Sequence, residues 1–519
     1  MSSLLSLQAF RIAVTSLPVA ASLCMTSAGV YAQDSGLEVS SNLAVSVIPY
    51  VSVTETLTDN VRLTSVGKQA EQITEVSPGI RVVVNGARLK SYFDYSLTGI
   101  VYAQNSSPRR TQNALNTFGT LEAIDNWAYL DFSGFISQQA ISAFGNQSIN
   151  NSSINQNQAE VSTFRLSPYV RGRLGDLANY DARYTRAITR SDAVAGSGVT
   201  SNEVVGRIGG DSTFRNLGWL ADASYQIVDY SAGRSTKASR SSIGLSYAIM
   251  SQLSVFANAG IEANNYTTFN SQSYRTSGFG LRWSLSERTN LSASRDNLSF
   301  GEGYSLNFEH RTARTAWRFS STKGVSTTPS QTSIASLGPI YDILYTQFAS
   351  IEPNPVLRAQ LVNAFLQANG VSPNATVINS FLTSAVSLQR QQNLMFALLG
   401  VRDTITFIAT QTETSRLDTL SRGIDDFNTS SLVRQRGFSV NYARRLTPDN
   451  SLGVLASQQN TSGSSSLQNT KLRLLNVNIT GRIGRKTFAS IGARRTMVSS
   501  SSTLSYKENA VYANLTAQF

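Results

Sequence analysis

The stretch KENAVYANLTAQF, residues 507–519, alternates apolar and polar side chains up to an aromatic last residue. Counted back from that residue, every second position is apolar: Phe519, Ala517, Leu515, Ala513 and Val511. Most positions between them are polar, so a strand here has one apolar and one polar face. We expect this strand to pair with the first strand of a transmembrane β-barrel, because closure removes the open sheet edge.

An aromatic residue at the end of an alternating strand is also typical of the pattern that barrel-inserting machinery reads. We therefore predict that the five apolar residues Val511, Ala513, Leu515, Ala517 and Phe519 form an assembly signal. The expected partners are the barrel-assembly machinery at this strand, and outer-membrane lipid and lipopolysaccharide around the barrel wall.

The composition excludes a helical membrane protein. Hydrophobic residues make up 41% of the 519 residues, and the mean hydropathy is −0.13. Beyond the N-terminal segment no run of roughly 18 apolar residues occurs. The formal net charge is +12 and the pI is about 9.8, but the basic residues are spread along the predicted strands. Because they form no cluster and no known motif, we expect no nucleic-acid partner.

The N-terminus resembles a secretory signal peptide over residues 1–32. Arg11 supplies the positive charge, an apolar stretch follows, and Ala32 ends a small-residue cleavage site. The single cysteine, Cys24, lies inside this segment after Leu23, which argues against lipidation. Residues 33–42 are expected to form a periplasmic leader. The mature chain then lacks cysteine, which excludes disulfides, thiol catalysis and Cys-ligated metals.

Alternating segments recur along the rest of the chain, as in Leu253, Val255, Ala257, Ala259 and Ile261. Short connections such as Ser251-Gln252 alternate with longer ones such as 265–273, which is typical of outer-membrane barrels. The fold class is therefore all-β: a transmembrane antiparallel up-and-down β-barrel of about 18–22 strands over residues 43–519.

One segment departs from the alternation. Residues 326–390 contain apolar residues at helical spacing, with Pro353 and Pro355 where a helix would begin. We predict a helical insertion on the outer side of the barrel or inside its lumen. It is either a cap that packs on the mouth or a plug that gates it.

Five charged residues are predicted to line the lumen: Arg183, Glu262, Arg282, Arg314 and Arg318. An Arg-rich lumen suits an anionic glycan, because guanidinium binds carboxylate, phosphate or sulfate in a planar fork. The alternative is a polar lumen filled by salt bridges. The single His, His310, has outward parity. We therefore predict no catalytic, cofactor-binding or metal-binding residue and no cofactor, although paired lumen carboxylates for glycan cleavage stay open.

Several short motifs resemble one known family, the PEP-CTERM system-associated outer-membrane β-barrel proteins. The motifs run from Tyr50 to Val61 and include Val76-Ser77-Pro78-Gly79-Ile80, Ile136-Ser137-Gln138-Gln139, Leu166-Ser167-Pro168-Tyr169, Pro353-Asn354-Pro355 to Arg358, and the Phe519 terminus. The resemblance spans most of the mature chain. It implies a Gram-negative species with exosortase-type sorting and an association with exopolysaccharide production. It implies no catalytic residues.

The sequence therefore predicts a non-enzymatic protein of the cell outer membrane that contributes to exopolysaccharide export or surface display. Its further partners would be exopolysaccharide and its export components. Two alternatives stay open: a general porin or solute channel, and a glycan-acting outer-membrane enzyme.

Overall fold

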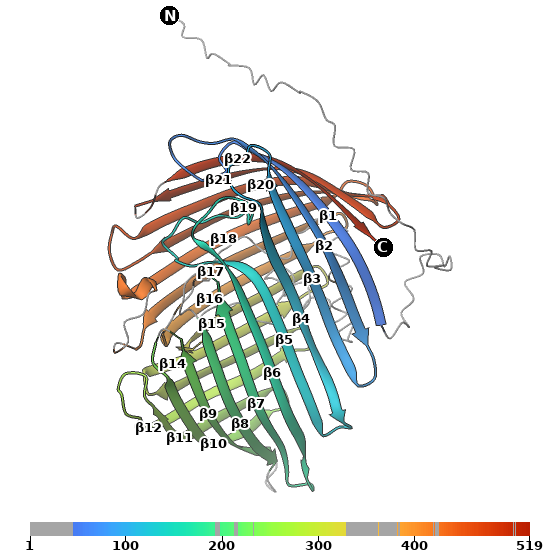
Figure 1. Cartoon of the computed structure of the whole chain (residues 1–519). Coiled ribbons are helices and arrows are strands. Elements are labelled where there is room, and N and C mark those ends of the chain that lie inside the picture. Colours follow the sequence, from blue (N-terminus) through green and yellow to red (C-terminus); the bar gives the residue numbers. More distant parts are fainter. Residues whose placement is uncertain are drawn as a thin grey trace, which may run out of the picture. The chain divides into compact units, whose positions relative to one another are not determined.

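The computed structural model describes residues 45–519 apart from 193–197, 212–215, 232, 328–361, 363–380, 382, 384, 419, 421–424, 502 and 504. The described chain forms one sheet of 22 antiparallel strands (Figure 1). The strands are β1 Val45–Thr58, β2 Glu71–Asn85, β3 Leu89–Tyr102, β4 Arg110–Ile124, β5 Ala128–Ala140, β6 Gln158–Leu174, β7 Ala178–Ser191, β8 Val199–Asp211, β9 Leu217–Tyr230, β10 Thr236–Met250, β11 Leu253–Asn264, β12 Gln272–Ser286, β13 Thr289–Leu298, β14 Gly301–Arg311, β15 Thr315–Ser326, β16 Ser387–Leu399, β17 Asp403–Arg416, β18 Leu432–Arg445, β19 Asn450–Ser462, β20 Asn469–Gly484, β21 Thr487–Ser500 and β22 Tyr506–Gln518. A 3₁₀ turn, η2, spans Asp426–Asn428.

The last strand closes the sheet into a barrel. β22 pairs with β1 from Tyr50 opposite Gln518 to Thr58 opposite Ala510. The Phe519 N–H continues this ladder by donating to the Pro49 carbonyl at 2.9 Å. Each remaining strand pairs with its neighbours in chain order, so no strand edge is left open. The predicted closed antiparallel barrel is confirmed, with a strand number at the top of the predicted range.

The two ends of the barrel differ in their connections. Even-numbered strands lead into short turns, such as 251–252 and 485–486. Most odd-numbered strands lead into longer connections, such as 59–70 and 141–157. We call these the short-turn end and the long-loop end. Because β1 begins and β22 finishes at the short-turn end, the alternation predicted from the sequence holds.

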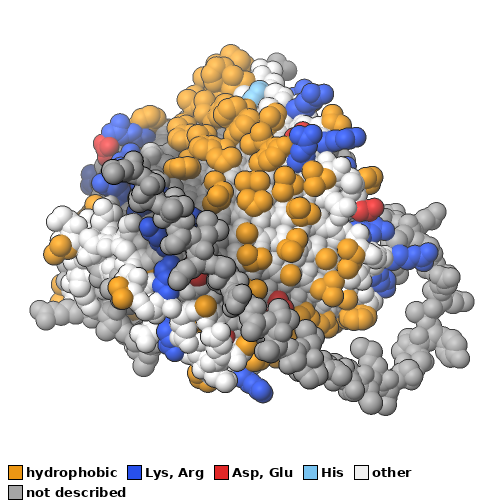
Figure 2. Space-filling view, turned by 90° about the horizontal axis from the view of Figure 1, so that it is seen from above, with side chains coloured by type: hydrophobic (Ala, Val, Ile, Leu, Met, Phe, Trp, Pro, Cys, Tyr) orange, Lys and Arg blue, Asp and Glu red, His pale blue; other side chains and the backbone are white. Residues whose placement is uncertain are grey.

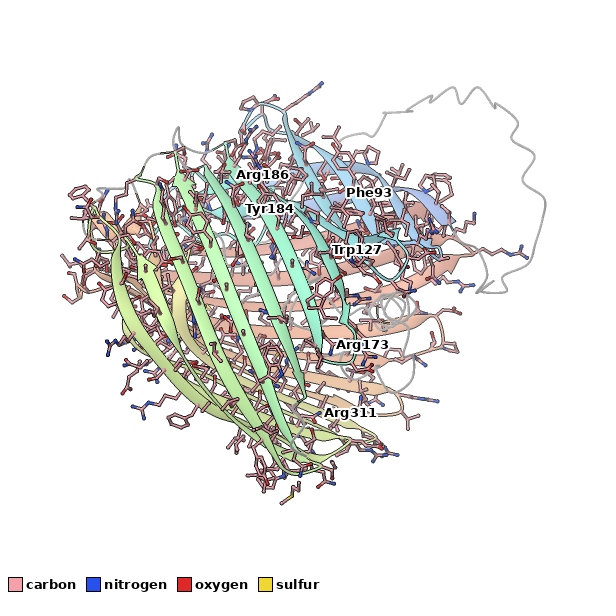
Figure 3. All side chains as sticks on the ribbon, turned by 90° about the horizontal axis from the view of Figure 1, so that it is seen from below. Phe93, Trp127, Arg173, Tyr184, Arg186 and Arg311 are labelled. Atoms are coloured by element: carbon pink, nitrogen blue, oxygen red, sulfur yellow. The ribbon has the colours of Figure 1, made fainter. Side chains whose placement is uncertain are left out.

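The two faces of the wall differ as strand alternation requires. On β22 the outward residues Val511 and Leu515 are 52% and 45% exposed, whereas Glu508 and Ala510 face inward and are buried. Large apolar side chains also stand exposed on the outside of other strands, including Ile243, Phe279 and Tyr184. Figure 2 shows hydrophobic side chains over the middle of the wall and Lys and Arg toward its margins, and Figure 3 shows Tyr184 on the wall. The barrel therefore presents an apolar belt to its surroundings.

The helical insertion predicted for 326–390 needs correction at both ends. Ser326 ends β15, and Ser387–Arg390 open β16, whose register with β15 continues through Val325 opposite Leu388. The alternating residues at both ends of the predicted insertion belong to strands, so β15 and β16 extend into the range predicted to be helical. Between them, 328–361 and 363–380 lie outside the described residues, so most of the predicted helical segment does too. Val362, which is described, is helical and buried. Both flanks lie at the long-loop end.

No described helix has the length and apolarity needed to cross a bilayer. The predicted signal peptide, 1–32, and the predicted leader, 33–42, lie outside the described residues.

Candidate functional site

The structure places four of the five predicted lumen residues on the inward face of the wall. Arg183 donates to Asp131 at 2.7 Å, and Arg318 lies 3.2 Å from Glu309. The Arg282 guanidinium lies 5.3 Å from the ring centroid of Phe256. The buried Glu262 carboxylate accepts hydrogen bonds from Asn264 and Ser299. Arg314 differs, because it lies in the turn 312–314 rather than on a strand.

A repeated hairpin organises the inward face of two parts of the wall. Ser77-Pro78 on β2 and Ser167-Pro168 on β6 each place a serine inward, and each serine hydrogen-bonds a threonine of the next strand. In both copies the arginine four residues after the serine stands opposite an aspartate. These pairs are Arg81 with Asp94 and Arg171 with Asp181. Each proline lies where the ladder to the next strand is interrupted, as its missing N–H requires.

In the first copy the arginine is fully engaged. Arg81 contacts Asp94 through Nε at 2.9 Å and Nη2 at 2.8 Å. The same carboxylate accepts the hydroxyl hydrogens of Tyr50 and Tyr92, at 2.8 and 3.0 Å. With both oxygens occupied, this cluster ties β1, β2 and β3 together and leaves little binding capacity for a solute.

In the second copy the arginine does not pair with the aspartate opposite it. Arg171 stacks over the Tyr129 ring at 4.3 Å and donates to its hydroxyl at 3.0 Å. Arg183, two residues after Asp181, instead pairs with Asp131 and stacks over Tyr169 at 3.9 Å. Stacking fixes each guanidinium plane and leaves its edge N–H groups directed at the lumen. This copy therefore presents arginine to the lumen where the first copy neutralises it.

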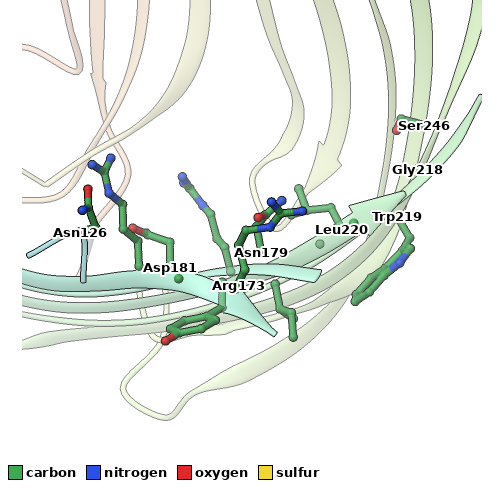
Figure 4. A pocket seen from close by; sticks show the side chains of 15 residues that line it. Asn126, Arg173, Asn179, Asp181, Gly218, Trp219, Leu220 and Ser246 are labelled. Carbon is green, nitrogen blue, oxygen red and sulfur yellow. The ribbon is translucent and has the colours of Figure 1, made fainter. Parts of the chain in front are cut away.

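The second copy opens onto a pocket near the short-turn end. The pocket measures about 670 Å³ and includes inward residues of β6, β7 and β8: Arg171, Arg173, Asn179, Asp181 and Arg207. Figure 4 shows Asn179 and Asp181 on one side of the sheet and Trp219 on the other. Arg171 and Arg207 flank Asp181 on neighbouring strands. We call Arg171, Arg173 and Arg207 the lumen arginine cluster.

The lumen arginine cluster presents guanidinium groups that are not bound in ion pairs with any described residue. All three arginines are exposed, and none forms an ion pair with a carboxylate in the described part of the chain. The acidic residues near them are Asp181, Asp222 and Glu122. Asp222 stands opposite Arg207 on β9 and accepts from Ser242 at 2.6 Å, and Glu122 accepts from Tyr129, to which Arg171 donates. Exposed guanidinium edges facing one cavity suit a carboxylate, phosphate or sulfate. The cluster can bind an anion but carries no nucleophile or proton-transfer pair.

Loop 141–157, between β5 and β6, folds into the barrel at the long-loop end. Its Ile154 N–H donates to the Val61 carbonyl at 2.9 Å, and Ile154 packs on inward residues of β2 and β3. Its carbonyls at Ser152 and Gln147 accept the hydroxyl hydrogens of Tyr102 and Tyr506. The Gln147 contact reaches β22 on the other side of the β1–β22 closure, so the loop occupies part of the interior.

The N-terminal part of loop 141–157 is held by η2. The Asp426 carboxylate accepts from the Ser142 hydroxyl at 2.6 Å and from the Ala143 N–H at 2.7 Å. Phe144 packs in a buried cluster with Phe381, Phe427 and Val433. Burial raises the pKa of the Asp426 carboxyl, and nearby Asp425 adds to this, although the two hydrogen bonds oppose the shift. Asp426 therefore couples the loop to pH.

Further candidates for chemistry among the described residues are metal-binding groups and the single histidine. They contain no group of three His, Cys, Asp or Glu side chains placed to hold a metal ion. His310 follows the outward parity of Phe308, and its Nδ1 lies 2.8 Å from the Thr289 hydroxyl.

Fold and site together define a class: a closed antiparallel barrel with an apolar outer belt, a polar interior, a loop folded inward and a cationic pocket. The family model described as "Protein of unknown function, DUF481" matches residues 201–320, which run from β8 to β15. No curated protein sequence matches the chain.

Among solved structures, the siderophore receptor PirA from Acinetobacter baumannii has a TM-score of 0.47 and 8% identity, over 91% of this chain and 80% of the receptor. The siderophore receptor PirA from Pseudomonas aeruginosa has a TM-score of 0.43 and 7% identity, over 91% of this chain and 80% of the receptor. The FrpB iron transporter from Neisseria meningitidis, F5-1 variant in apoprotein form, has a TM-score of 0.46 and 9% identity, over 91% of this chain and 81% of the transporter. At these values the likeness carries no information about a ligand.

Sequence reasoning missed the lumen arginine cluster and the inward path of loop 141–157. The repeated Ser-Pro motif was a usable signal for the first, because counting in twos from Ser167 places Arg171 and Arg173 inward. No comparable signal marks the loop, whose partners Val61, Asp426 and Tyr506 lie far away in sequence.

Proposed function

We propose that the chain is an outer-membrane β-barrel that binds and passes an anionic glycan. Its apolar outer belt supports the membrane location, because exposed apolar side chains on a closed barrel match a lipid environment. Its closed ladder leaves no backbone group on a strand edge for lipid to face. The predicted location in the cell outer membrane is part of this proposal.

The lumen arginine cluster is the observation that carries the choice of an anionic solute. Arg171, Arg173 and Arg207 face one pocket, and no described carboxylate neutralises them by an ion pair. Their fork geometry matches carboxylate or sulfate groups on a sugar, and hydroxyl groups are further acceptors for the same N–H donors.

The role in exopolysaccharide export or surface display rests on this cluster and on the resemblance to PEP-CTERM system-associated barrels. A strain without the gene should secrete or display less exopolysaccharide, measured as cell-surface and culture-fluid glycan. Restoring the wild-type gene, but not one lacking the lumen arginine cluster, should restore the amount. Unchanged glycan in the deletion strain would remove this role.

The binding step is tested on purified, folded protein with polygalacturonate, a carboxylate-bearing glycan, and dextran, an uncharged one. Arg171→Gln, Arg173→Gln and Arg207→Gln together should weaken polygalacturonate binding by at least about tenfold, since the loss of even one charged hydrogen bond, worth about 1.5–3 kcal/mol, has that effect. Dextran should bind weakly to both proteins. Arg288→Gln, Arg402→Gln and Arg485→Gln remove the same charge from exposed turns at the same end and should leave binding unchanged. Equal affinity of wild type and cluster variant would contradict the proposal.

A general porin is the second candidate, and loop 141–157 is the observation that favours it, because an inward loop narrows a lumen without selecting a glycan. A porin would conduct small ions in planar bilayers with no change on adding polygalacturonate, whereas a glycan conduit would show polygalacturonate-dependent block. A glycan-cleaving enzyme gains no support at Glu262, because its Oε1 already accepts hydrogen bonds from Asn264 and Ser299. We propose a non-enzymatic role.

A further inference from the structure

The outer face of β18–β22 carries a group of basic side chains at the long-loop end. We call this group the outer basic patch; it consists of Arg434, Arg436, Lys471, Arg473, Arg495 and Lys507. The lumen site does not involve these residues, because they point away from the interior.

Strand alternation and register place the patch together. On β18, Arg436 is two residues from the outward, 44% exposed Phe438, so both share the outer face. Register then carries this face across the sheet. Arg436 stands opposite Asn460 on β19, and Asn460 stands opposite Lys471 on β20.

The remaining members lie on the next two strands. Arg473 stands opposite Met497 on β21, and Met497 stands opposite Lys507 on β22. Arg495, two residues from Met497, shares that outer face. Neighbouring strands lie about 4.8 Å apart, so the patch is continuous over five strands.

The patch carries more basic side chains than neighbouring carboxylates can pair. The single acidic residue of β18–β22 is Glu508, which faces inward, is buried and pairs with Arg494 at 3.0 Å. Glu413 on β17 pairs with Arg434 at 2.6 Å. Arg436, Lys471, Arg495 and Lys507 have no ion-pair partner among the described residues, and Arg473 donates to the neutral Gln458 at 3.1 Å. Asp59 borders the patch, where it accepts hydrogen bonds from Asn509 and lies 3.6 Å from Lys68. The patch therefore keeps a surplus of positive charge.

Its height on the wall is set by the apolar belt. Immediately toward the short-turn end stand exposed Phe438, Leu475, Ile491 and Val511. A Lys or Arg facing the bilayer midplane costs about 2–4 kcal/mol, falling to about 0–1 near the interface. Basic side chains directly beyond the belt therefore lie at the headgroup level of the leaflet at the long-loop end.

We propose that the outer basic patch binds the phosphates of lipid A, the phosphorylated glycolipid of lipopolysaccharide. The proposal rests on the outer-membrane location proposed above. Lipid A carries phosphate at both ends of a disaccharide, so one molecule offers two anionic groups to a surface of this width. Arginine forks bind phosphate bidentately, and lysine adds point charges. Asn460, exposed on the same face, supplies an amide donor for sugar hydroxyls.

The opposite end of the same strands differs. There the outward basic residue of β18, Arg444, lies 3.8 Å from Asp403. Among the outward strand positions of β18–β22, the basic side chains without an ion-pair partner in the described chain therefore lie at the long-loop end, whereas Arg485 and Lys486 at the other end lie in a turn. This asymmetry favours a phosphate-rich glycolipid of that leaflet over a phospholipid common to both.

The test uses purified full-length protein in detergent and counts bound lipid by native mass spectrometry. The probes are diphosphoryl lipid A, monophosphoryl lipid A and phosphatidylglycerol. Wild type should bind diphosphoryl lipid A at least about tenfold more tightly than either other lipid, and binding should persist in EDTA because arginine replaces bridging cations. Arg436→Gln, Lys471→Gln, Arg473→Gln and Arg495→Gln together should lower that affinity by at least about tenfold.

A matched control removes four positive charges elsewhere. Arg288→Gln, Arg402→Gln, Arg485→Gln and Lys486→Gln all lie in exposed or half-exposed turns at the short-turn end, and this variant should bind lipid A as wild type does. Equal binding by the patch variant, or equal affinity of wild type for phosphatidylglycerol, would overturn the proposal. Insertion into vesicles and polygalacturonate binding are measured on the same samples. If the protein inserts into vesicles and binds polygalacturonate but shows no preference for diphosphoryl lipid A, only this inference fails. If the protein does not insert into vesicles, the proposed membrane location fails.

Discussion

At the scale of single residues, Asp94 shows how a lumen charge stabilises the wall. Its two oxygens accept from Tyr50, Tyr92 and Arg81, which come from three neighbouring strands. Asp94→Asn removes the charge and leaves the half-buried Arg81 guanidinium without its ion pair. We expect the free energy of unfolding to fall by about 1–3 kcal/mol, measured by urea titration in lipid vesicles.

The control for this prediction is Asp125, which pairs with Arg88 at 2.8 Å in an exposed turn contact. Asp125→Asn should change stability by less than about 0.5 kcal/mol, because exposed ion pairs contribute little. A similar loss in both variants would mean that Asp94 acts through net charge and not through its local partners.

The sequence predicts on which face of the wall each side chain lies, but not which residue it pairs with. Alternation alone places Arg81, Asp94 and Arg183 inward, because the strand period is two. It does not say that Arg183 reaches across β6 to form an ion pair with Asp131, or that Asp181 forms none with Arg171. That choice depends on side-chain lengths and on register between strands, which the period leaves open.

At the scale of elements, the strands were predictable and the inward loop was not. Each strand can be predicted from a local alternation of apolar and polar residues and from the turn residues that follow it. Loop 141–157 instead takes its position from η2, the 59–70 connection and the start of β22. These contacts join segments far apart in the chain, so no local pattern encodes them. The same holds for Arg314, which lies in a turn because β14 and β15 end short of it.

The link between loop 141–157 and Asp426 makes the loop sensitive to pH. Because burial raises the pKa of Asp426 above its usual 3.8, the folded state binds more protons than the unfolded state between the two values. The loop contact is therefore firmest at low pH and weakens as pH rises through the raised pKa. Hydrogen exchange of loop amides, corrected for intrinsic rates, should show protection falling over that range.

Asp426→Asn should flatten this pH dependence, because the amide does not titrate and still accepts a hydrogen bond. Asp449→Asn, in an exposed turn at the other end of the barrel, should keep the wild-type profile. If Asp426→Asn and wild type share one pH profile, another group controls the loop.

At the scale of the whole molecule, closure of β22 on β1 determines the register of the entire wall. The mature chain lacks cysteine if cleavage follows Ala32, so introduced thiols meet no competitors. Val53 and Leu515 stand opposite each other on the outer face. Cysteines at directly opposed strand positions fall within the Cα separation of about 4.4–6.8 Å that a disulfide needs. Val53→Cys with Leu515→Cys should therefore oxidise readily in the folded barrel.

The cross-link converts the wall into a covalent ring, which constrains the unfolded chain and should raise stability by about 2–4 kcal/mol. The oxidised variant should migrate faster than its reduced form after full denaturation and should need a higher temperature to lose its folded band. Val53→Cys with Val511→Cys keeps two outward thiols but sets them four residues out of register, since Val511 stands opposite Leu57. Cross-linking of this second pair, or none of the first, would show that β1 and β22 do not close the barrel in this register.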